Sequence, residues 1–320
     1  MTNQSPKEAA EFLLSHDNYT ILTHRRPDGD TVGCASALCA ALRQLGKKAS
    51  VLRNPQITER YACYLEGMTC ENPDGCIVST DISSPVQLPL NYSGAVEYCI
   101  DHHGSNDGFA ARTCLEAECG ACAELVYKIL LEMKAEITPA IANALYVGVS
   151  TDTGCFRYAN TSPQTLRTAA DLLEYGADNA NINHTIFEIK SKSRLEVESY
   201  LTEHMELYAG GKVGLCTLPI AVNNVIKASE DDLDSLAGFS RNMEGVEIGG
   251  LLRDLPTGQS KISLRTDSRL WDASKICSLL GGGGHTAAAG AAMDCSLPEL
   301  HEKLLSAIAE VTGLSMEPKA

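Results

Sequence analysis

Two carboxylates and an imidazole are crowded into seven residues near the N-terminus. The segment ILTHRRPDGDTVG, residues 21–33, places His24, Asp28 and Asp30 between an apolar run and a stretch of small residues. Like charges held this close repel one another, so an opposite charge has to offset them. Carboxylate and imidazole groups are also common ligands of divalent cations. The spacing therefore predicts a metal site at this point of the chain.

More groups of the same kinds follow other apolar runs. Asp81 follows CIVST, the triplet Asp-His-His at 101–103 follows EYCI, and Asp152 ends LYVGVSTD. Each has a simpler interpretation when taken alone. An acid such as Asp30 is often a helix cap, and a single histidine is usually structural. Four segments that all end in acid or imidazole instead favour metal-dependent phosphoester chemistry.

Short β-rich runs alternate with helical patterns over the first half of the chain. We expect strands at 19–24, 47–53, 75–83 and 94–103, and helices at 31–46, 122–135 and 139–153. This alternation predicts an α/β fold, a parallel sheet with helices on both faces. Ligands of such sheets bind beyond the carboxyl ends of the strands, where the acids and imidazoles would gather.

Charge balance predicts how many cations this site holds. Asp28, Asp30, Asp81 and Asp152 bring four negative charges, and two divalent cations would balance them. With His24 and His102 they offer six nitrogen and oxygen ligands. Two cations about 3.5–4 Å apart form the clamp used for in-line phosphoryl displacement. Mixed ligation of this kind suits Mn²⁺, with Mg²⁺ and Co²⁺ as alternatives.

The second half of the chain predicts a smaller α/β domain. We expect a helical connector at 185–208, a strand at 213–220, a helix around 230–243, a hairpin over 245–268 that turns at DLPTGQ, a helix at 272–280 and a closing helix from about 297. The expected boundaries are 1–188 for a metal-binding catalytic domain, 189–210 for a helical linker and 211–320 for a substrate-binding domain. We expect a cleft between the two domains.

Composition and charge limit the classes of function. The chain has 320 residues, of which 44% are hydrophobic and 21% charged, with a net charge of −15. Tracking along a long nucleic acid needs a basic footprint, so this acidic balance disfavours it. No apolar run is long enough to cross a bilayer, and the polar N-terminal segment shows no signal-peptide pattern. We therefore expect a cytoplasmic protein with no membrane contact.

The thirteen cysteines are scattered and lie mostly in apolar runs. We interpret them as small buried hydrophobic residues in a reducing compartment. Cys119 and Cys122 have the CxxC spacing of redox and zinc motifs, but no second CxxC accompanies them. We favour small residues at a helix start. A redox role stays open, because thiols at a helix N-terminus are acidified.

These motifs resemble those of the DHH phosphoesterase superfamily, which is named for an Asp-His-His triplet, here Asp101, His102 and His103. The first family motif, His-x-x-Pro-Asp-x-Asp-x-x-Gly, is met by His24, Pro27, Asp28, Asp30 and Gly33. Asp81 after an apolar strand meets the second motif, and Asp152 in STDTGCFRY meets the fourth. GGGGHTAAAG at 281–290 is similar to the signature of the DHH-associated C-terminal domain. The likeness spans about residues 15 to 310.

The resemblance implies a role for each of these residues. It implies two sets of metal ligands that share Asp81: His24 and Asp28 in one, and Asp30, His102 and Asp152 in the other. His103 would face the scissile phosphate, and Asp101 would orient an imidazole. A hydroxide between the two cations would be the nucleophile.

The resemblance also implies substrate contacts. Gly282, Gly283 and Gly284 would wrap a phosphate with their N–H groups, and His285 would add a donor. A helix that starts at the following alanines would add its dipole. A glycine hinge with a tight helix contact is the alternative. Arg265 would contact a substrate phosphate. A solvated arginine on a strand is the alternative for this residue. Arg157 is the remaining residue that we expect to contact the substrate.

Two-domain members of this size hydrolyse very short RNA and dephosphorylate 3′-phosphoadenosine 5′-phosphate (pAp). We therefore expect a Mn²⁺-dependent hydrolase of pAp and of oligoribonucleotides of two to five nucleotides. A cyclic di-AMP or pApA phosphodiesterase is the alternative among enzymes, and a non-catalytic nucleotide-binding module is the alternative outside them. The presence of all six ligand positions favours an enzyme. The sequence leaves open whether the chain forms a homodimer.

Overall fold

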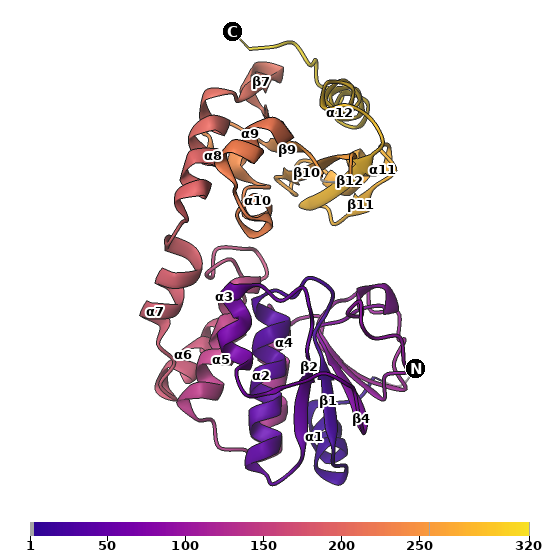
Figure 1. Ribbon diagram of the computed structural model, residues 1–320, viewed down its shortest axis with the longest axis vertical. Coiled ribbons are helices and arrows are strands. Elements are labelled where there is room, and N and C mark those ends of the chain that lie inside the picture. The colour runs from indigo at the N-terminus through magenta and orange to yellow at the C-terminus, as the bar shows by residue number, and fades with distance from the viewer. Residues whose placement is uncertain (1–2, 256, 320) are drawn as a thin grey trace. The chain divides into compact units, whose positions relative to one another are not determined.

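The structure is a computed structural model that describes residues 3–255 and 257–319. The chain divides into two compact units between Ile189 and Lys190. Each unit is built on its own six-stranded sheet with its own hydrophobic clusters (Figure 1). In the described ranges, no helix combines the length and the apolar character that crossing a bilayer requires.

The sheet of the first unit is parallel throughout, with the strand order β3-β2-β1-β4-β5-β6. Its strands are β1 (Tyr19–Leu22), β2 (Ala49–Leu52), β3 (Thr69–Cys70), β4 (Cys76–Thr80), β5 (Tyr98–Asp101) and β6 (Arg112–Leu115). The chain runs outward from β1 to β3 on one side and from β4 to β6 on the other. At such a reversal of strand order, the carboxyl ends of neighbouring strands leave a crevice for a ligand.

The helices of this unit form one core with a single face of the sheet. They are α1 (Pro6–Ser15), α2 (Gly29–Gln44), α4 (Cys122–Glu132), α5 (Pro139–Asp152), α6 (Pro163–Glu174) and α7 (Asn179–Asn183), and the one-turn helix α3 (Glu59–Ala62) lies between β2 and β3. Asp28 caps α2, and Thr138 caps α5, where Pro139 takes the first helical position as expected. α2 and α5 pack so closely that a Cβ on Gly33 would lie 2.2 Å from the Ala144 carbonyl oxygen.

The other face of this sheet is covered by the connections 81–97 and 102–111, which hold one 3-10 turn at Pro85–Gln87. This differs from the helices expected on both faces. Right-handed crossovers place these two connections opposite α2. Pro85 and Pro89 interrupt helix formation in the first connection. The second is shorter than the dozen or more residues that a helical crossover needs.

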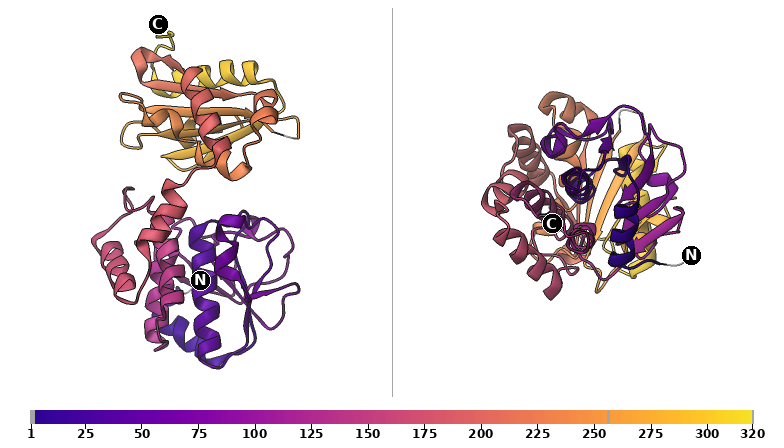
Figure 2. Two further views of the ribbon diagram at one scale, coloured as in Figure 1. Left: turned by 60° about the vertical axis from the view of Figure 1, so that its left-hand side comes forward. Right: turned by 90° about the horizontal axis from the view of Figure 1, so that it is seen from below.

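The second unit has a mixed sheet in the order β11-β12-β10-β9-β8-β7, in which only the β8–β9 pair is parallel among the strands described. Its strands are β7 (Glu206–Tyr208), β8 (Val213–Leu218), β9 (Ile248–Asp254), β10 (Ser260–Thr266), β11 (Gly283–Gly284) and β12 (Ala288–Met293). One face packs against α8 (Lys192–Glu203), α9 (Ile220–Ile226) and α10 (Glu230–Ser235), and the other against α11 (Ala273–Ser278) and α12 (Leu297–Thr312) (Figure 2).

Three local features of this half differ from the sequence predictions. The alanines after the glycines do not start a helix: Ala288–Met293 is strand β12, because it pairs with β10 and buries Ala289 and Ala291. The connector at 185–208 is not helical throughout, since it begins within the π-helical turn His184–Glu188 and ends in β7. The helix expected around 230–243 is instead α10 followed by a 3-10 turn at Phe239–Asn242.

The predicted hairpin over 245–268 is confirmed by the antiparallel pairing of β9 with β10. Its expected turn, DLPTGQ, includes Pro256, which lies outside the described residues. The closing helix is confirmed as α12, which begins at Leu297 with Ser296 as its cap.

Candidate metal centre

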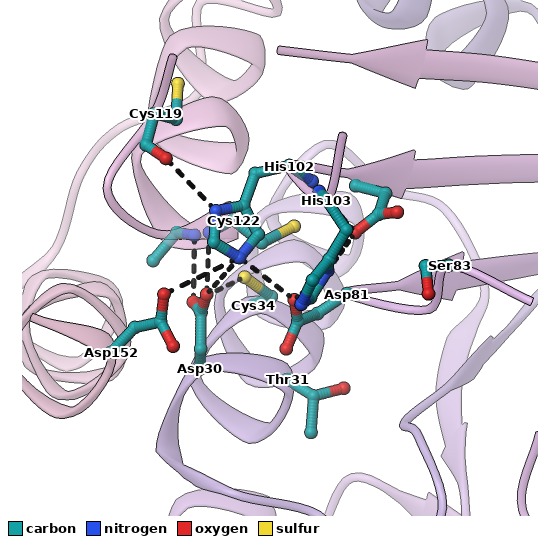
Figure 3. A network of polar contacts seen from close by, with 12 residues as sticks. Asp30, Thr31, Cys34, Asp81, Ser83, His102, His103, Cys119, Cys122 and Asp152 are labelled. Carbon is teal, nitrogen blue, oxygen red and sulfur yellow. Dashed lines mark hydrogen bonds and ion pairs between the residues drawn. The ribbon is translucent and has the colours of Figure 1, made fainter. Parts of the chain in front are cut away.

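The structure brings the six side chains predicted as metal ligands together at the carboxyl edge of the first sheet: His24 after β1, Asp81 after β4, His102 after β5, Asp28 and Asp30 at the start of α2, and Asp152 at the end of α5. Figure 3 shows four of them, Asp30, Asp81, His102 and Asp152, pointing toward one another. β1 and β4 flank the point where the strand order reverses. The side chains therefore lie where a parallel sheet is open to a ligand.

Asp81 stands between two groups of ligand atoms. Its Oδ2 is 3.6 Å from His24 Nε2, and its Oδ1 is 3.5 Å from His102 Nε2. His24 Nε2 is also 3.4 Å from Asp28 Oδ1. The ligand atoms of His24, Asp28 and Asp81 all lie within 4.8 Å of one another.

The second group is centred on His102. Its Nε2 is 3.6 Å from Asp152 Oδ2 and 3.9 Å from Asp30 Oδ2. The ligand atoms of these three residues also lie within 4.8 Å of one another. Since Asp81 reaches His102 as well as His24, one carboxylate is shared between the two groups.

Backbone carbonyls fix the orientation of both imidazoles. Nδ1 of His24 is 2.9 Å from the Arg25 oxygen, and Nδ1 of His102 is 3.1 Å from the Cys119 oxygen. A carbonyl can only accept, so each Nδ1 carries the proton and each Nε2 faces the carboxylates. Metal-ligating histidines are held in this way by their other ring nitrogen.

Asp30 is held by the N-terminus of α4. Its Oδ2 accepts from the Cys122 N–H at 2.6 Å, and its Oδ1 accepts from the Ala123 N–H at 2.9 Å. The residue that precedes α4, Ala121, has no side chain that could cap the helix. Asp30 therefore caps α4 from another helix, and the helix dipole stabilises the carboxylate in return.

His103 and Asp101 form a hydrogen-bonded pair beside the six ligands. His103 Nδ1 is also 3.5 Å from Asp81 Oδ1, so Asp81, His102 and His103 make a third group of possible ligands. His103 Nδ1 donates to Asp101 Oδ1 at 2.8 Å, and Asp101 Oδ2 accepts from Asn106 Nδ2 at 2.6 Å. Asp101 is fully buried, whereas the His103 side chain is 30% exposed. The hydrogen bond to Asp101 raises the pKa of His103 above its usual value.

Burial and mutual repulsion shift the acids of the centre. Burial raises the pKa of Asp30 to about 7, and the Asp81 carboxylate adds to the shift. Burial and the Asp30 carboxylate raise the pKa of Asp152 to about 7 as well. The pKa of Asp81 is raised chiefly by burial. Dense negative charge in a buried place thus favours the protonated forms of these three acids. Burial would raise the pKa of Asp28 too, but His24 lowers it below its usual value.

The pKa values of the two imidazoles are raised as well, in their case by the neighbouring carboxylates. Burial would lower the pKa of His24, but Asp28 and then Asp81 raise it to about 10. Burial would likewise lower the pKa of His102, but Asp81 and Asp30 raise it to about 10. Positive charge on the imidazoles offsets the carboxylates here, and divalent cations would do the same.

The donor set fits divalent cations. His102 Nε2 and Asp81 Oδ1 are buried and have no hydrogen-bond partner. A buried polar atom without a partner costs about 1–3 kcal/mol. A cation bound between them would satisfy both atoms, and a mixed set of imidazole and carboxylate ligands is one that Mn²⁺ accepts.

Arg157 lies on the loop that follows Asp152. It is exposed, and its Nε donates to the Gly154 oxygen at 2.6 Å. Gly154, Cys155 and Phe156 have φ values of 56°, 57° and 62°, so three successive residues take the left-handed conformation. This loop belongs to the first unit, whereas the other predicted substrate contacts belong to the second.

The glycine motif of the second unit forms a hairpin. Gly283 and Gly284 are strand β11 and pair with β12. His285 is exposed at the turn, where its N–H donates to the Ala288 oxygen at 2.8 Å. A Cβ on Gly282 would lie 2.1 Å from the Gly290 oxygen, so this close approach requires glycine. Arg265 lies on β10, and its Nη1 donates to the Leu264 oxygen.

The CxxC pair supports the centre through its backbone. All thirteen cysteines are free thiols in the described ranges. Cys122 starts α4 and is buried, as the small-residue interpretation expects. Burial raises the pKa of Cys119 to about 12, so this thiol is not acidified. The Cys119 carbonyl and the Cys122 N–H hold two proposed ligands, and no motif in the sequence indicates these backbone contacts.

Two further supporting residues were missed. Asn106 holds Asp101, and Gly148 on α5 faces Asp30 so closely that a Cβ would lie 2.7 Å from its Oδ1. The available signal for Gly148 was a glycine inside an apolar helical pattern, which indicates a close contact without naming its partner.

Comparison with known proteins identifies the class of protein. The model of the DHH family, N-terminal domain, matches residues 18–149, and the model of the DHHA1 domain matches residues 217–313. The chain belongs to the DHH family and is a hydrolase of phosphoester bonds. The resemblance drawn from the motifs is thereby confirmed.

Individual relatives are similar over nearly the whole length. The chain is 31% identical to the bifunctional oligoribonuclease and PAP phosphatase NrnA of Thermus thermophilus over 295 residues, which cover 91% of this chain and 89% of the relative. It is 22% identical to the protein of the same name from Bacillus subtilis, with 89% and 92% covered. An exopolyphosphatase-related protein from Bacteroides fragilis shares the fold, with a TM-score of 0.84, 22% identity and 96% of each chain covered.

Proposed function

We propose that this chain is a Mn²⁺-dependent phosphoesterase that hydrolyses short oligoribonucleotides and removes phosphate from pAp. The observation that carries the proposal is that Asp81 contacts both His24 and His102, one histidine from each of the two ligand groups. The relatives named oligoribonuclease and PAP phosphatase support this class of substrate. The net charge of −15 supports short substrates over long nucleic acid.

In this proposal the six ligands hold two divalent cations: His24 and Asp28 hold one, Asp30, His102 and Asp152 hold the other, and Asp81 contacts both. When bound, such a pair ionises water near neutral pH and stabilises the charge that develops on the phosphoryl group. Mn²⁺ suits this donor set, and Mg²⁺ and Co²⁺ are the alternatives.

His103 and Asp101 act on the substrate side of the proposed centre. Because Nδ1 of His103 donates to Asp101, its Nε2 remains available to a substrate. The raised pKa of His103 favours the imidazolium, which can donate through Nε2 to a phosphate oxygen. Asp101 keeps the ring in this orientation.

Substrate phosphates are further contacted, in the proposal, by Arg157, by Arg265 and His285, and by the N–H groups of Gly282, Gly283 and Gly284. Their support comes from the resemblance and from the exposure of Arg157 and His285. Direct contact between the glycine N–H groups and a phosphate is limited to those that the β11–β12 pairing leaves free.

Product analysis with Mn²⁺ tests the proposal. Wild-type protein and Asp81→Ala are offered pAp, pApA, a five-nucleotide RNA and cyclic di-AMP. We expect stepwise release of mononucleotides from RNA and phosphate from pAp. Asp81→Ala should reduce both rates by at least about 10²–10³-fold. Asp17→Ala is the matched control, because Asp17 precedes β1 and lies at the opposite end of that strand.

Two outcomes would contradict the proposal. Turnover confined to cyclic di-AMP or pApA would make the chain a phosphodiesterase of signalling nucleotides. An absence of any Asp81-dependent turnover would leave a nucleotide-binding module as the better explanation.

A further inference from the structure

The segment 119–123, which leads from the β6–α4 connection into the first turn of α4, holds two of the proposed ligands directly. The Cys119 carbonyl accepts from His102 Nδ1 at 3.1 Å (Figure 3). The Cys122 and Ala123 N–H groups donate to Asp30 at 2.6 and 2.9 Å. The positions of both side chains therefore depend on the backbone of this segment.

A third ligand is tied to the same segment through Asn160. Asn160 Nδ2 donates to the Gly120 oxygen at 2.8 Å and to the Asp152 oxygen at 3.1 Å. The segment thus supports all three members of one ligand group: Asp30, His102 and Asp152.

The other ligand group has a different support. His24 Nδ1 bonds to the Arg25 oxygen, and Asp28 Oδ1 accepts from the N–H groups of Asp30 and Thr31. These contacts lie within residues 24–31. A change confined to 119–123 should therefore act on one ligand group more than on the other.

Glu124 anchors the segment through the hydrogen bonds of its buried side chain. Its side chain is 1% exposed, and its Oε1 accepts from the Gly120 N–H at 2.9 Å and from Thr165 Oγ1 at 2.7 Å. A Cβ on Gly120 would lie 2.7 Å from the Asn160 oxygen and 3.0 Å from Glu124 Oε1, so the segment is tightly enclosed. Removing the carboxylate would leave two buried donors without their acceptor and free the segment to move.

We propose that Glu124 is a positioning residue that sets the affinity of the cation held by Asp30, His102 and Asp152. The inference rests on the proposed function, because it assumes that the centre binds two cations. Coordination distances tolerate shifts of only about 0.2 Å, so a small movement of the segment lowers affinity. A carboxylate that served only the overall fold would act on both cations equally.

The test is a calorimetric titration of the full-length chain with Mn²⁺. Glu124→Ala should lower the affinity for one Mn²⁺ by about tenfold or more and leave the affinity for the other within about threefold of the wild-type value. His102→Ala identifies which step of the isotherm belongs to that cation. Glu124→Gln should retain both affinities, because its amide oxygen can still accept both hydrogen bonds.

Two more variants separate positioning from folding. Asn160→Ala removes an exposed side chain, so it should fold and weaken the same cation. Ser36→Ala is the control. Ser36 lies further along α2 and donates to the Tyr64 oxygen in the 3-10 turn Cys63–Leu65, so both affinities should stay unchanged.

Unchanged affinities in folded Glu124→Ala, or equal weakening of both cations, would overturn the inference while leaving the proposed function intact. If Glu124→Ala does not fold, Asn160→Ala decides, and unchanged affinities there overturn the inference. Wild-type protein that binds no Mn²⁺ would overturn the inference and the proposed function together.

Discussion

Asp81 is the residue on which both ligand groups depend. It has a φ of 61°, a left-handed conformation that costs a residue with a side chain about 1–3 kcal/mol. Its N–H donates to the Ile100 oxygen at 2.8 Å, which ties this conformation to β5. Strain held in place by neighbouring structure is characteristic of functional sites. The strained backbone of Asp81 is consistent with a carboxylate that has to face His24 and His102 at once.

Asp101→Asn tests the orientation of His103. Asp101 accepts four hydrogen bonds, from the N–H groups of His102 and His103, from His103 Nδ1 and from Asn106. An asparagine replaces one of the two acceptor oxygens of Asp101 with an NH₂ donor, and it removes the negative charge beside His103. We expect kcat on pAp to fall by about 10–100-fold.

The matched control for this variant is Asp171→Asn. Asp171 lies on α6, where it accepts from the hydroxyl of Tyr127 on α4, and it belongs to none of the ligand groups. It should keep the wild-type kcat, and both variants should show cooperative thermal unfolding. An unchanged kcat in Asp101→Asn would remove Asp101 from the proposed mechanism.

At the scale of elements, the centre depends on close contact between helices. α2, α4 and α5 meet where Gly148 faces Asp30, and a Cβ there would lie 2.6 Å from Ala123 Cβ and 2.7 Å from Asp30 Oδ1. We expect Gly148→Ala to destabilise the chain by about 1–3 kcal/mol through overpacking. It should also reduce turnover, because Asp30 is displaced. Thermal unfolding and pAp hydrolysis measure the two effects.

Gly67→Ala separates the two effects of that prediction. Gly67 has a φ of +70° and no atom within 4 Å of an added Cβ. Alanine there costs about 1–2 kcal/mol of backbone strain but touches nothing near Asp30. It should lower stability and spare turnover. Equal turnover in Gly148→Ala and Gly67→Ala, at equal stability, would contradict the role assigned to Gly148.

Elements were predictable where the local pattern decides them. The apolar strands that end in Asp81 and in the triplet 101–103 could be recognised, because a buried strand followed by ligand-type residues is a local signal. The strand at Ala288–Met293 could not, because alanine and glycine favour it only through pairing with β10. The contact of Asp30 with the N–H of Cys122 joins residues 92 apart, beyond the reach of any local pattern.

At the scale of the whole molecule, charge and stability are linked through the centre. The net charge is −15, and four of the acids face one another within the first unit. Cations bound there relieve this repulsion and bind only the folded unit. At a free concentration of about 100 times Kd, each Mn²⁺ should stabilise the folded state by about 2.7 kcal/mol.

The unfolding temperature of wild-type protein should therefore rise with Mn²⁺ and return to its starting value with a chelator. Asp81→Ala should show a much smaller rise, because it loses the carboxylate shared by both groups. The same unfolding temperature with and without Mn²⁺ in wild-type protein would contradict a cation site in this unit.

Anomalous diffraction from crystals grown with Mn²⁺ tests most directly whether Asp81 is shared by two cations. We expect two peaks about 3.5–4 Å apart. One should contact His24 and Asp28, the other Asp30, His102 and Asp152, and Asp81 should contact both. A single peak, or two peaks that do not share Asp81, would contradict this expectation.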